Sequence, residues 1–271
     1  MRAWEQFGNR GTGPWGDTLM TSSPRIIPSP QMNADYDQIK LVAQLKPDLI
    51  LETDLHGDPE RYRGLARIAP VISAPKGTGE FYSSTLQDQT LRVAQAMGVP
   101  EQGQQLVDSL KARIASVPTE HPEFAGKSIS LLSKYETKWM GQINDIERLK
   151  FFLDLGFRQN PAFLALAEKT KLDPDAIELP PKDFRAVDAD LVVVDATWTS
   201  SGIDPATDPS SAETLSKNAR FASLPATRDG RSFIFVANPD RPYWEALDRP
   251  SVLAVSWLLD NLVPEIAEKL K

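Results

Sequence analysis

The chain of 271 residues is 41% hydrophobic, so it can bury a large core as one domain or as two lobes. Its net charge of −7 argues against nucleic acid as a partner, because nucleic acid binds to a basic protein surface. The absence of cysteine and the presence of only two histidines exclude disulfides, thiol nucleophiles and a histidine-rich metal site, and no apolar run reaches the roughly 18 residues of a membrane span.

Short elements separated by proline and glycine fill the first hundred residues. DLILE at 48–52 is a short apolar run of the kind found in a buried parallel strand. Lys46 and Pro47 end the preceding helix, because the residue before a proline avoids the helical conformation. The predicted order is a loop over 1–30, a helix over 36–45, a strand over 48–52, a short helix with Pro59 in its first turn, a strand over 71–75 and a helix over 83–97 that stops at Gly98.

Strands and helices continue to alternate in the second half of the chain. Leu106, Leu110, Ile114 and Val117 form one apolar stripe, which predicts a helix over 101–117 placed to bridge two units. Such alternation predicts an α/β fold with parallel sheets in two lobes. The later elements are strands over 128–133, 190–196 and 232–237 and helices over 145–156, 211–225 and 250–270.

One pattern occurs twice. LKPDLILETD at 45–54 and VDADLVVVDA at 187–196 both place an Asp before an apolar run that ends near an acidic residue. A loop and a short acidic helix follow each copy, which predicts two lobes of equivalent construction. The alternative is that any two strands of an α/β protein resemble each other.

Familiar catalytic and nucleotide-binding motifs lack the context that their chemistry requires. GTGPWG at 11–16 matches G-x-G-x-x-G, but neither a strand before it nor a helix after it is predicted. GKS at 126–128 leads into a strand instead of following one, so it does not predict a phosphate loop. No nucleophile, base and orienting group are brought together by the sequence, and we do not expect an enzyme.

Several segments in a fixed order resemble the class III periplasmic binding proteins, the solute receptors of iron–siderophore, haem and vitamin B12 ABC importers. The similarity is greatest to the iron–siderophore branch. It implies two α/β lobes joined by a long rigid helix, with a ligand in the cleft between them and no catalysis. The segments are LKPDLILETD, GDPERYRGL, IAPVI, QTLRVAQAMGVPEQGQQLVDSL, FAGKSISLLS, LKFFLDLGF, DADLVVV and LPATRDGRSFIFV.

The resemblance also implies boundaries and a location. The expected parts are an N-terminal lobe over 1–100, the connecting helix over 101–117 and a C-terminal lobe over 118–271. Family members begin with a signal segment, often a lipid-modified cysteine, and a further strand–helix unit, so we expect this chain to be an N-terminally truncated form. We expect an extracytoplasmic monomer whose protein partner is an ABC permease dimer and whose membrane contact is limited to a lipid anchor outside this chain.

A siderophore already surrounds its iron, so its receptor needs aromatic faces and hydrogen-bonding or positive tips on loops after strands. Ordinary packing is the alternative for each aromatic side chain. The resulting ligand-binding candidates are Trp15, Tyr82, Tyr135, Lys138, Trp139, Trp198, Arg241, Tyr243 and Trp244.

In the family, an acidic residue on each lobe pairs with permease arginines. Glu60 and Glu213 stand at the equivalent places after the two repeated strands. Each also suits the first turn of a helix, which is the alternative explanation for its presence. The expected ligand is a ferric siderophore, and the sequence does not decide between hydroxamate, catecholate and other types. Haem or cobalamin is the alternative within the family, and an α/β enzyme that uses the cleft is the alternative outside it. Neither an intrinsic cofactor nor a metal site is expected.

Overall fold

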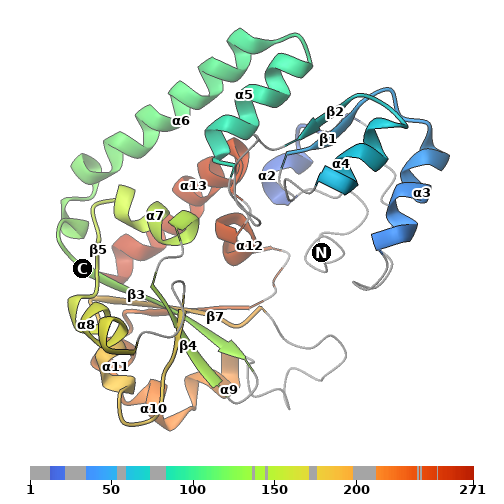
Figure 1. The fold of residues 1–271 in the computed structure, drawn as a ribbon. Helices are drawn as coiled ribbons and strands as arrows, with labels where there is room; N and C mark the ends of the chain where they lie inside the picture. The colour runs from blue at the N-terminus through green and yellow to red at the C-terminus, as the bar shows by residue number, and fades with distance from the viewer. Residues whose placement is uncertain are drawn as a thin grey trace. The chain divides into compact units, whose positions relative to one another are not determined.

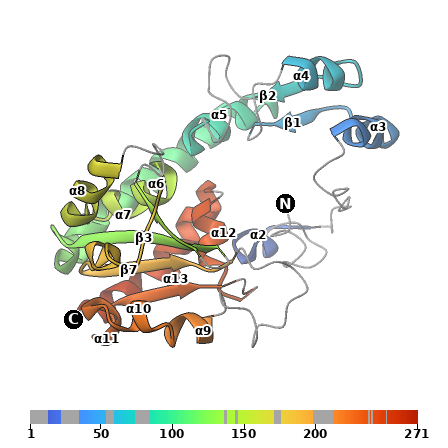
Figure 2. The same cartoon turned by 60° about the horizontal axis from the view of Figure 1, so that its bottom comes forward.

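The structure is a computed structural model of the chain, drawn in Figures 1 and 2. It divides into two compact units, one formed by Met1 with Ser22–Lys111 and the other by Arg2–Thr21 with Ala112–Lys271. It describes residues 13–21, 35–53, 59–73, 84–135, 138–143, 146–170, 176–197, 212–236, 238, 240–248 and 250–271.

The first unit contains a parallel pair of strands with helices around it. Ile50 of β1 pairs with Val71 of β2, and β1 and β2 form a two-stranded sheet within the described residues. The predicted helix, strand, helix, strand, helix order is confirmed. The elements are α3 (Asp35–Leu45), β1 (Ile50–Glu52), α4 (Pro59–Ala66), β2 (Val71–Ser73), α5 (Leu86–Ala96) and the first half of α6 (Pro100–Glu120).

Local chemistry fixes both ends of helix α5 and its close approach to α6. The Thr85 hydroxyl accepts a hydrogen bond from the Asp88 backbone N–H at 3.1 Å and caps α5. Gly98, with φ +74°, follows the end of α5, as predicted, because glycine enters the left-handed region without a Cβ penalty. A Cβ on Gly103 would lie 2.3 Å from the Cβ of Ala94, so glycine is needed for α5 and α6 to approach this closely.

The second unit is built on one sheet, which has six strands within the described residues. Its strand order is β6-β4-β3-β7-β8, with β5 paired to the start of β3. Strands β3, β7 and β8 are mutually parallel, whereas β4 runs antiparallel to β3 and to β6. All five residues of β7 are buried, as the unbroken run LVVVD predicts for an inner parallel strand. The strands are β3 (Ser128–Tyr135), β4 (Lys138–Gln142), β5 (Arg158–Gln159), β6 (Ala176–Glu178), β7 (Leu191–Asp195) and β8 (Ser232–Phe235).

Helices cover both faces of this sheet. In Figure 1, α7, α12 and α13 lie on one side of the strands, and α8 to α11 lie on the other. The predicted terminal helix is confirmed as α13, capped by the Ser251 hydroxyl. The helices are α2 (Pro14–Asp17), η2 (Pro122–Phe124), α7 (Ile146–Asp154), α8 (Pro161–Thr170), η3 (Phe184–Val187), α9 (Ala212–Ser216), α10 (Ala219–Ala222), α11 (Pro225–Arg228), α12 (Tyr243–Asp248) and α13 (Val252–Lys269).

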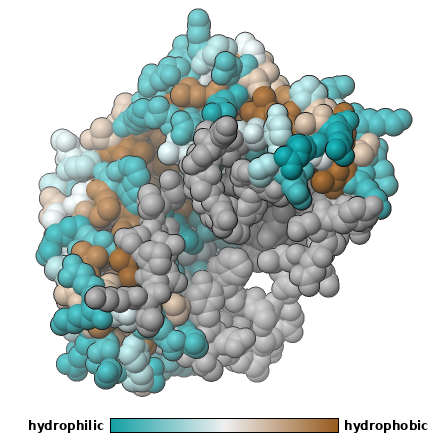
Figure 3. All heavy atoms as spheres, viewed as in Figure 1, coloured by the Kyte–Doolittle hydropathy of each residue, from teal (hydrophilic) through white to brown (hydrophobic). Residues whose placement is uncertain are grey.

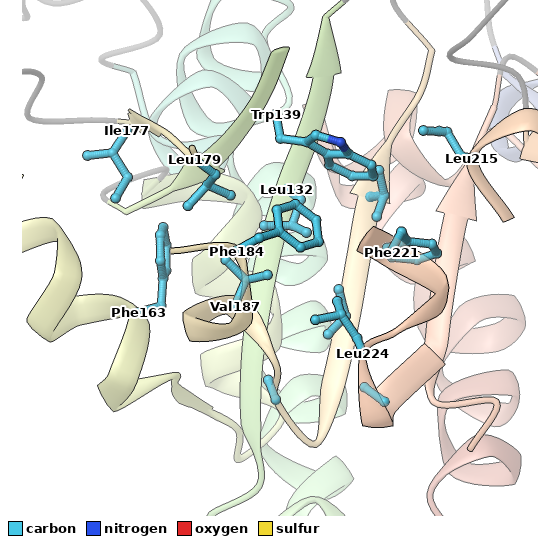
Figure 4. Close-up of a cluster of buried hydrophobic side chains, with 14 of the residues drawn as sticks. Leu132, Trp139, Phe163, Ile177, Leu179, Phe184, Val187, Leu215, Phe221 and Leu224 are labelled. Carbon is cyan, nitrogen blue, oxygen red and sulfur yellow. The ribbon is translucent and has the colours of Figure 1, made fainter. Parts of the chain in front are cut away.

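A cluster of buried apolar side chains fills the space between the sheet and the α8–α11 side. Figure 4 shows Trp139, Phe184 and Leu132 close together with Phe221 nearby, and the Trp139 and Phe184 rings meet edge to face. Gly141 permits this packing, because a Cβ at that position would lie 2.3 Å from a ring atom of Phe163. This cluster is the core of the second unit on that face of the sheet.

Some predicted elements differ from the observed ones. The single helix expected over 211–225 is two short helices, α9 and α10, because the Asn218 side chain accepts hydrogen bonds from the N–H groups of Arg220 and Phe221 and starts α10 anew. A third short helix, α11, begins only at Pro225. The expected loop over 1–30 contains the four-residue helix α2. Strands β4, β5 and β6, helices α8 and α12, and the short 3₁₀ helices η2 and η3 were not predicted.

Figure 3 shows polar and apolar residues interspersed on the visible face, with no single continuous apolar belt among the coloured residues. None of the described helices combines the length and apolar character needed to cross a membrane. The α/β fold class predicted from the sequence is confirmed.

Candidate functional site

The carboxyl ends of β3, β7 and β8 lie at one edge of the second unit's sheet, because these strands are parallel. In open α/β sheets, ligands bind outside this edge. Helix α12 begins at Tyr243, eight residues after β8 ends at Phe235 (243 − 235), and therefore also lies at this edge. The edge is the natural place to look for a binding site.

A row of aromatic side chains lies at this edge. The Trp257 ring of α13 is 5.7 Å from the Trp15 ring of α2 and 5.3 Å from the Tyr243 ring of α12, centroid to centroid. The Phe235 ring at the end of β8 continues the row, at 5.5 Å from Tyr243 and 6.4 Å from Trp244. Trp15 and Trp257 are partly exposed, whereas Tyr243 and Trp244 are buried. We call these five residues the aromatic row.

Two arginines lie against the aromatic row. The Arg148 guanidinium of α7 is 4.8 Å from the centre of the Trp244 ring and donates a hydrogen bond to Asp248 at 2.8 Å. The Arg241 guanidinium is 5.4 Å from the centre of the Tyr243 ring and pairs with Glu265. Both arrangements combine a cation–π contact with an ion pair, which fixes the planar guanidinium relative to the ring.

The hydroxyl of Tyr243 donates a hydrogen bond to Glu265 at 2.7 Å. Burial is the main cause that raises the pKa of Tyr243 above its ordinary value, and the hydrogen bond to the Glu265 carboxylate raises it further. Tyr243 is therefore a neutral phenol at physiological pH, with one face in the aromatic row.

Asp195, the last residue of β7, is 1% exposed. Its Oδ1 accepts hydrogen bonds from the backbone N–H of Thr197 at 2.9 Å and from the Thr197 hydroxyl at 2.6 Å. Burial raises the pKa of Asp195 to about 6, although Thr197 and the charge of Arg148 both lower it. The carboxyl group therefore titrates close to neutral pH.

Glu245 of α12 is a second buried carboxyl group at this edge. Burial raises its pKa to about 7, with further contributions from the charges of Asp195 and Asp248. Asp195 Oδ2, Glu245 Oε2 and the indole N–H of Trp244 are buried and have no hydrogen-bond partner. Together with Arg148 and Asp248 these residues form what we call the carboxylate cluster.

The predicted ligand residues whose side chains the structure describes fall into two groups. Trp15, Arg241, Tyr243 and Trp244 are brought together in or against the aromatic row. Trp15 lies in helix α2, and Tyr243 and Trp244 lie in helix α12, so these three residues are not on the loops that the sequence predicted.

Lys138 and Trp139 lie elsewhere, on β4. The expectation that they occupy a loop after the strand is wrong, because β3 continues to Tyr135 and the chain turns back directly as β4. Trp139 is 2% exposed, stacks on Phe221 at 5.8 Å and contacts Phe184 edge-on at 5.0 Å. Its packing is that of a core residue, and its contact with a ligand stays a prediction.

The Lys138 ammonium group is exposed and donates a hydrogen bond to Glu178 of β6 at 2.9 Å. Tyr82 and Trp198 lie outside the described residues, as does the side chain of Tyr135 at the end of β3. Ligand contact by these four residues stays a prediction.

The two predicted docking residues lie in equivalent surroundings. Glu60 is in the first turn of α4, and Glu213 is in the first turn of α9. Both carboxylates are largely exposed, with Arg63 at 3.9 Å from Glu60 and Lys217 paired with Glu213. The hydrogen bond from Lys217 is the main cause that lowers the pKa of Glu213.

Sequence reasoning missed Arg148, Asp195, Glu245 and Trp257. For Asp195 a signal was present, since an acidic residue closes an apolar run whose strand is buried on both faces. The others lie within helices, and nothing in the local pattern separates them from ordinary helical residues. Among the described residues, no group of three or more His, Cys, Asp or Glu side chains is placed to hold a metal ion.

The arrangement suits the binding of a ligand with flat or apolar surface and polar groups at its rim. Partly exposed rings supply contact area, and the paired guanidinium groups supply hydrogen-bond donors.

The chain matches one protein family. A family model described as "Periplasmic binding protein" matches residues 29–237. No curated protein matches significantly.

Solved structures share the fold. A periplasmic solute binding protein from Mycobacterium smegmatis superposes with a TM-score of 0.74 and 25% identity, over 97% of this chain and 83% of that one. The iron uptake ABC transporter substrate-binding protein PiaA from Streptococcus pneumoniae gives a TM-score of 0.66 and 19% identity, over 96% and 84%. PiaA has also been solved with ferrichrome. FhuD2 from Staphylococcus aureus with ferrioxamine B gives 0.64 and 14%, over 98% and 90%.

Proposed function

Because the chain belongs to the periplasmic binding protein family, we propose that it captures a ferric siderophore outside the cytoplasm and delivers it to an ABC permease. Members of this family are substrate-binding proteins, and the family implies an extracytoplasmic location. PiaA with ferrichrome and FhuD2 with ferrioxamine B, which share the fold, support a siderophore as the ligand class.

The observation that carries the proposal is the aromatic row with its two arginines at the carboxyl edge of the second unit's sheet. A ferric siderophore is bulky and its iron is already fully coordinated, so a receptor has to supply surface contact and hydrogen bonds. Trp15 and Trp257 offer partly exposed ring faces, and Arg241 lies beside them with its guanidinium held by Glu265. The absence of a metal-ligating group among the described residues is compatible with a ligand that keeps its own iron.

The test is a tryptophan-fluorescence titration with ferrichrome, ferrioxamine B and a ferric tris-catecholate. We expect saturable quenching by at least one complex, because Trp15 and Trp257 lie at the edge where the ligand binds. Ferric nitrilotriacetate, which supplies iron without a siderophore, is expected to give none. Haem and cobalamin are titrated in parallel, and binding of either without binding of any siderophore would reassign the ligand within the family.

Matched variants locate the ligand. Trp257→Phe removes an indole from the aromatic row and is expected to weaken binding about fivefold, since one aromatic contact is lost in part. Trp139→Phe makes the same change in the core on the other face of the sheet and is expected to leave affinity unchanged. The opposite ranking would move the ligand to the β4 side, where the sequence placed Lys138 and Trp139.

Delivery to a permease is the second part of the proposal. Glu60 and Glu213 are exposed carboxylates at the start of helices that follow the two repeated strands. One exposed carboxylate on each unit suits docking on arginines of the two subunits of a permease dimer. The chain binds as a monomer in this proposal.

A further inference from the structure

The carboxylate cluster at the candidate site has an excess of negative charge. Asp195, Glu245 and Asp248 are three carboxylates, and Arg148 is the cation that lies among them in the described part of the chain. Asp248 is matched by Arg148 at 2.8 Å. Asp195 Oδ2 and Glu245 Oε2 have no hydrogen-bond partner, and both side chains are more than nine-tenths buried.

The described residues of the neighbouring elements that we name below do not balance this charge. Ser133 of β3 is the register partner of Asp195, and its hydroxyl accepts from the Gln142 side chain, so this neighbour is neutral. Lys134 is the next residue on β3, where its side chain points to the opposite face of the sheet, 5.9 Å from the Trp139 ring centre. On the α13 side, Arg241 is already matched by Glu265.

A third buried polar atom without a partner belongs to the same cluster. The Trp244 indole N–H has no partner, although the Arg148 guanidinium lies against the ring of that residue. Buried polar groups without partners are rare in folded proteins and each needs an explanation. Here they occur together, next to the row of aromatic residues that we assign to the ligand.

We propose that Asp195 and Glu245 select the ligand by charge, so that the site prefers a ferric complex carrying a pendant ammonium group to its neutral counterpart, and both to an anionic catecholate complex. This inference rests on the proposed function and names the charge class of its ligand. Contact is not required, because a charge acts over several ångströms through a protein interior that screens weakly.

The preference is expected to depend on pH. The pKa values of about 6 for Asp195 and about 7 for Glu245 mean that the cluster gains negative charge as the pH rises through neutrality. A bound cation favours the ionised forms, so binding near pH 7 releases part of a proton from Glu245. A neutral ligand has no such effect.

Ferrioxamine B and its N-acetylated form test the proposal, because they share one iron centre and differ in the terminal ammonium group. At about pH 8 we expect the ammonium form to bind about fivefold more tightly, as one charge at about 10 Å gives at intermediate screening. At about pH 5.5 the two forms are expected to bind nearly equally, since both carboxyl groups are then largely protonated.

Variants assign the effect to these residues. Asp195→Asn with Glu245→Gln is expected to reduce the fivefold ratio at about pH 8 to near one. Glu178→Gln, which removes an exposed carboxylate from β6, is the matched control and is expected to keep the ratio. Calorimetry of the unaltered protein at about pH 7, in two buffers of different ionisation enthalpy, checks proton release independently of any variant.

The outcomes separate the inference from the function on which it rests. Equal affinity for both forms at every pH, no proton release, or tighter binding of a ferric tris-catecholate would overturn the charge selection and leave a siderophore receptor in place. Failure of every siderophore complex to bind would reject the proposed function and the inference with it.

Discussion

Strands β1 and β7 come from the two copies of one sequence pattern but lie in different surroundings. Within the described residues, β1 has β2 as its neighbour, and its central residue Leu51 is 48% exposed. Strand β7 has neighbours on both edges and helices on both faces, and all five of its residues are buried. The same pattern therefore specifies a strand followed by an acidic helix, but it does not specify how deeply the strand is buried.

The difference in burial between β1 and β7 changes the surroundings of the acidic residue that ends each strand. Glu52 ends β1 and pairs with Arg61 of α4, so its charge is neutralised locally. Asp195 ends β7 and is hydrogen-bonded at one oxygen only, with the other buried and without a partner. The acidic residue that forms an ion pair at the end of β1 therefore corresponds, at the end of β7, to a buried carboxyl group without a paired cation of its own.

The largest expected effect comes from placing a charge at the centre of each strand. Val193→Asp puts a carboxylate at a fully buried position of β7 and is expected to destabilise the protein by more than about 4 kcal/mol. Leu51→Asp makes the equivalent change in β1 and is expected to cost less than about 1 kcal/mol, because the side chain is half exposed. Urea unfolding followed by circular dichroism measures both, and similar costs would show that the two strands are equally buried.

The next effect concerns Asp195 and its pH dependence. The pKa of Asp195 in the folded protein, about 6, lies above the ordinary value of 3.8. The contribution of Asp195 to the free energy of unfolding is therefore fully present below about pH 4 and is lost as the pH rises to about 6. The loss attributable to this group is about 3 kcal/mol, and Asp195→Asn is expected to remove it. The measurement is the difference in unfolding free energy between variant and parent from about pH 4 to pH 8. A constant difference across that range would contradict the raised pKa.

Glu52 is expected to behave in the opposite sense. Glu52→Gln removes the carboxylate that pairs with Arg61 and is expected to destabilise the protein by about 1 kcal/mol. The matched comparison with Asp195→Asn at about pH 8 is therefore a difference in sign, which thermal unfolding resolves. If Glu52→Gln stabilised the protein, the Glu52 carboxylate would be destabilising, as the Asp195 carboxylate is expected to be.

The smallest effect on stability is expected where the two copies are most alike. Glu60→Ala with Glu213→Ala removes two exposed carboxylates and is expected to leave the unfolding midpoint and siderophore affinity unchanged. Uptake of the ferric siderophore by cells is expected to fall sharply, because docking on the permease is lost. A double variant with full uptake would remove these residues from the docking surface, and Asp229→Ala serves as the exposed carboxylate control.

Much of the fold follows from the order of short apolar runs and glycine or proline punctuation. Strand β7 and helix α13 were predicted because burial on both faces and strict helical periodicity leave strong patterns. Strand β4 was not predicted, because KWMGQ is short and its pairing with β3 is a tertiary choice. The alternation of buried and half-exposed residues in β4 identifies it as a strand only when its pairing with β3 is known.

The candidate site could be predicted only where a residue's place in the chain decides its place in the fold. Arg241, Tyr243 and Trp244 follow a predicted strand, so the rule that ligands lie beyond strand ends identified them. Arg148 and Trp257 reach the same edge from α7 and α13. Helix packing places them there, and helix packing is not encoded in any local pattern.

The packing of α2 against α13 has a consequence for how the second unit folds. This unit joins Arg2–Thr21 to Ala112–Lys271, and the ring of Trp15 in α2 contacts the ring of Trp257 in α13. The two residues are 242 positions apart (257 − 15), and contacts between segments so distant in sequence are slow to form because a long loop of chain must close first. We therefore expect the aromatic row to be completed late in folding.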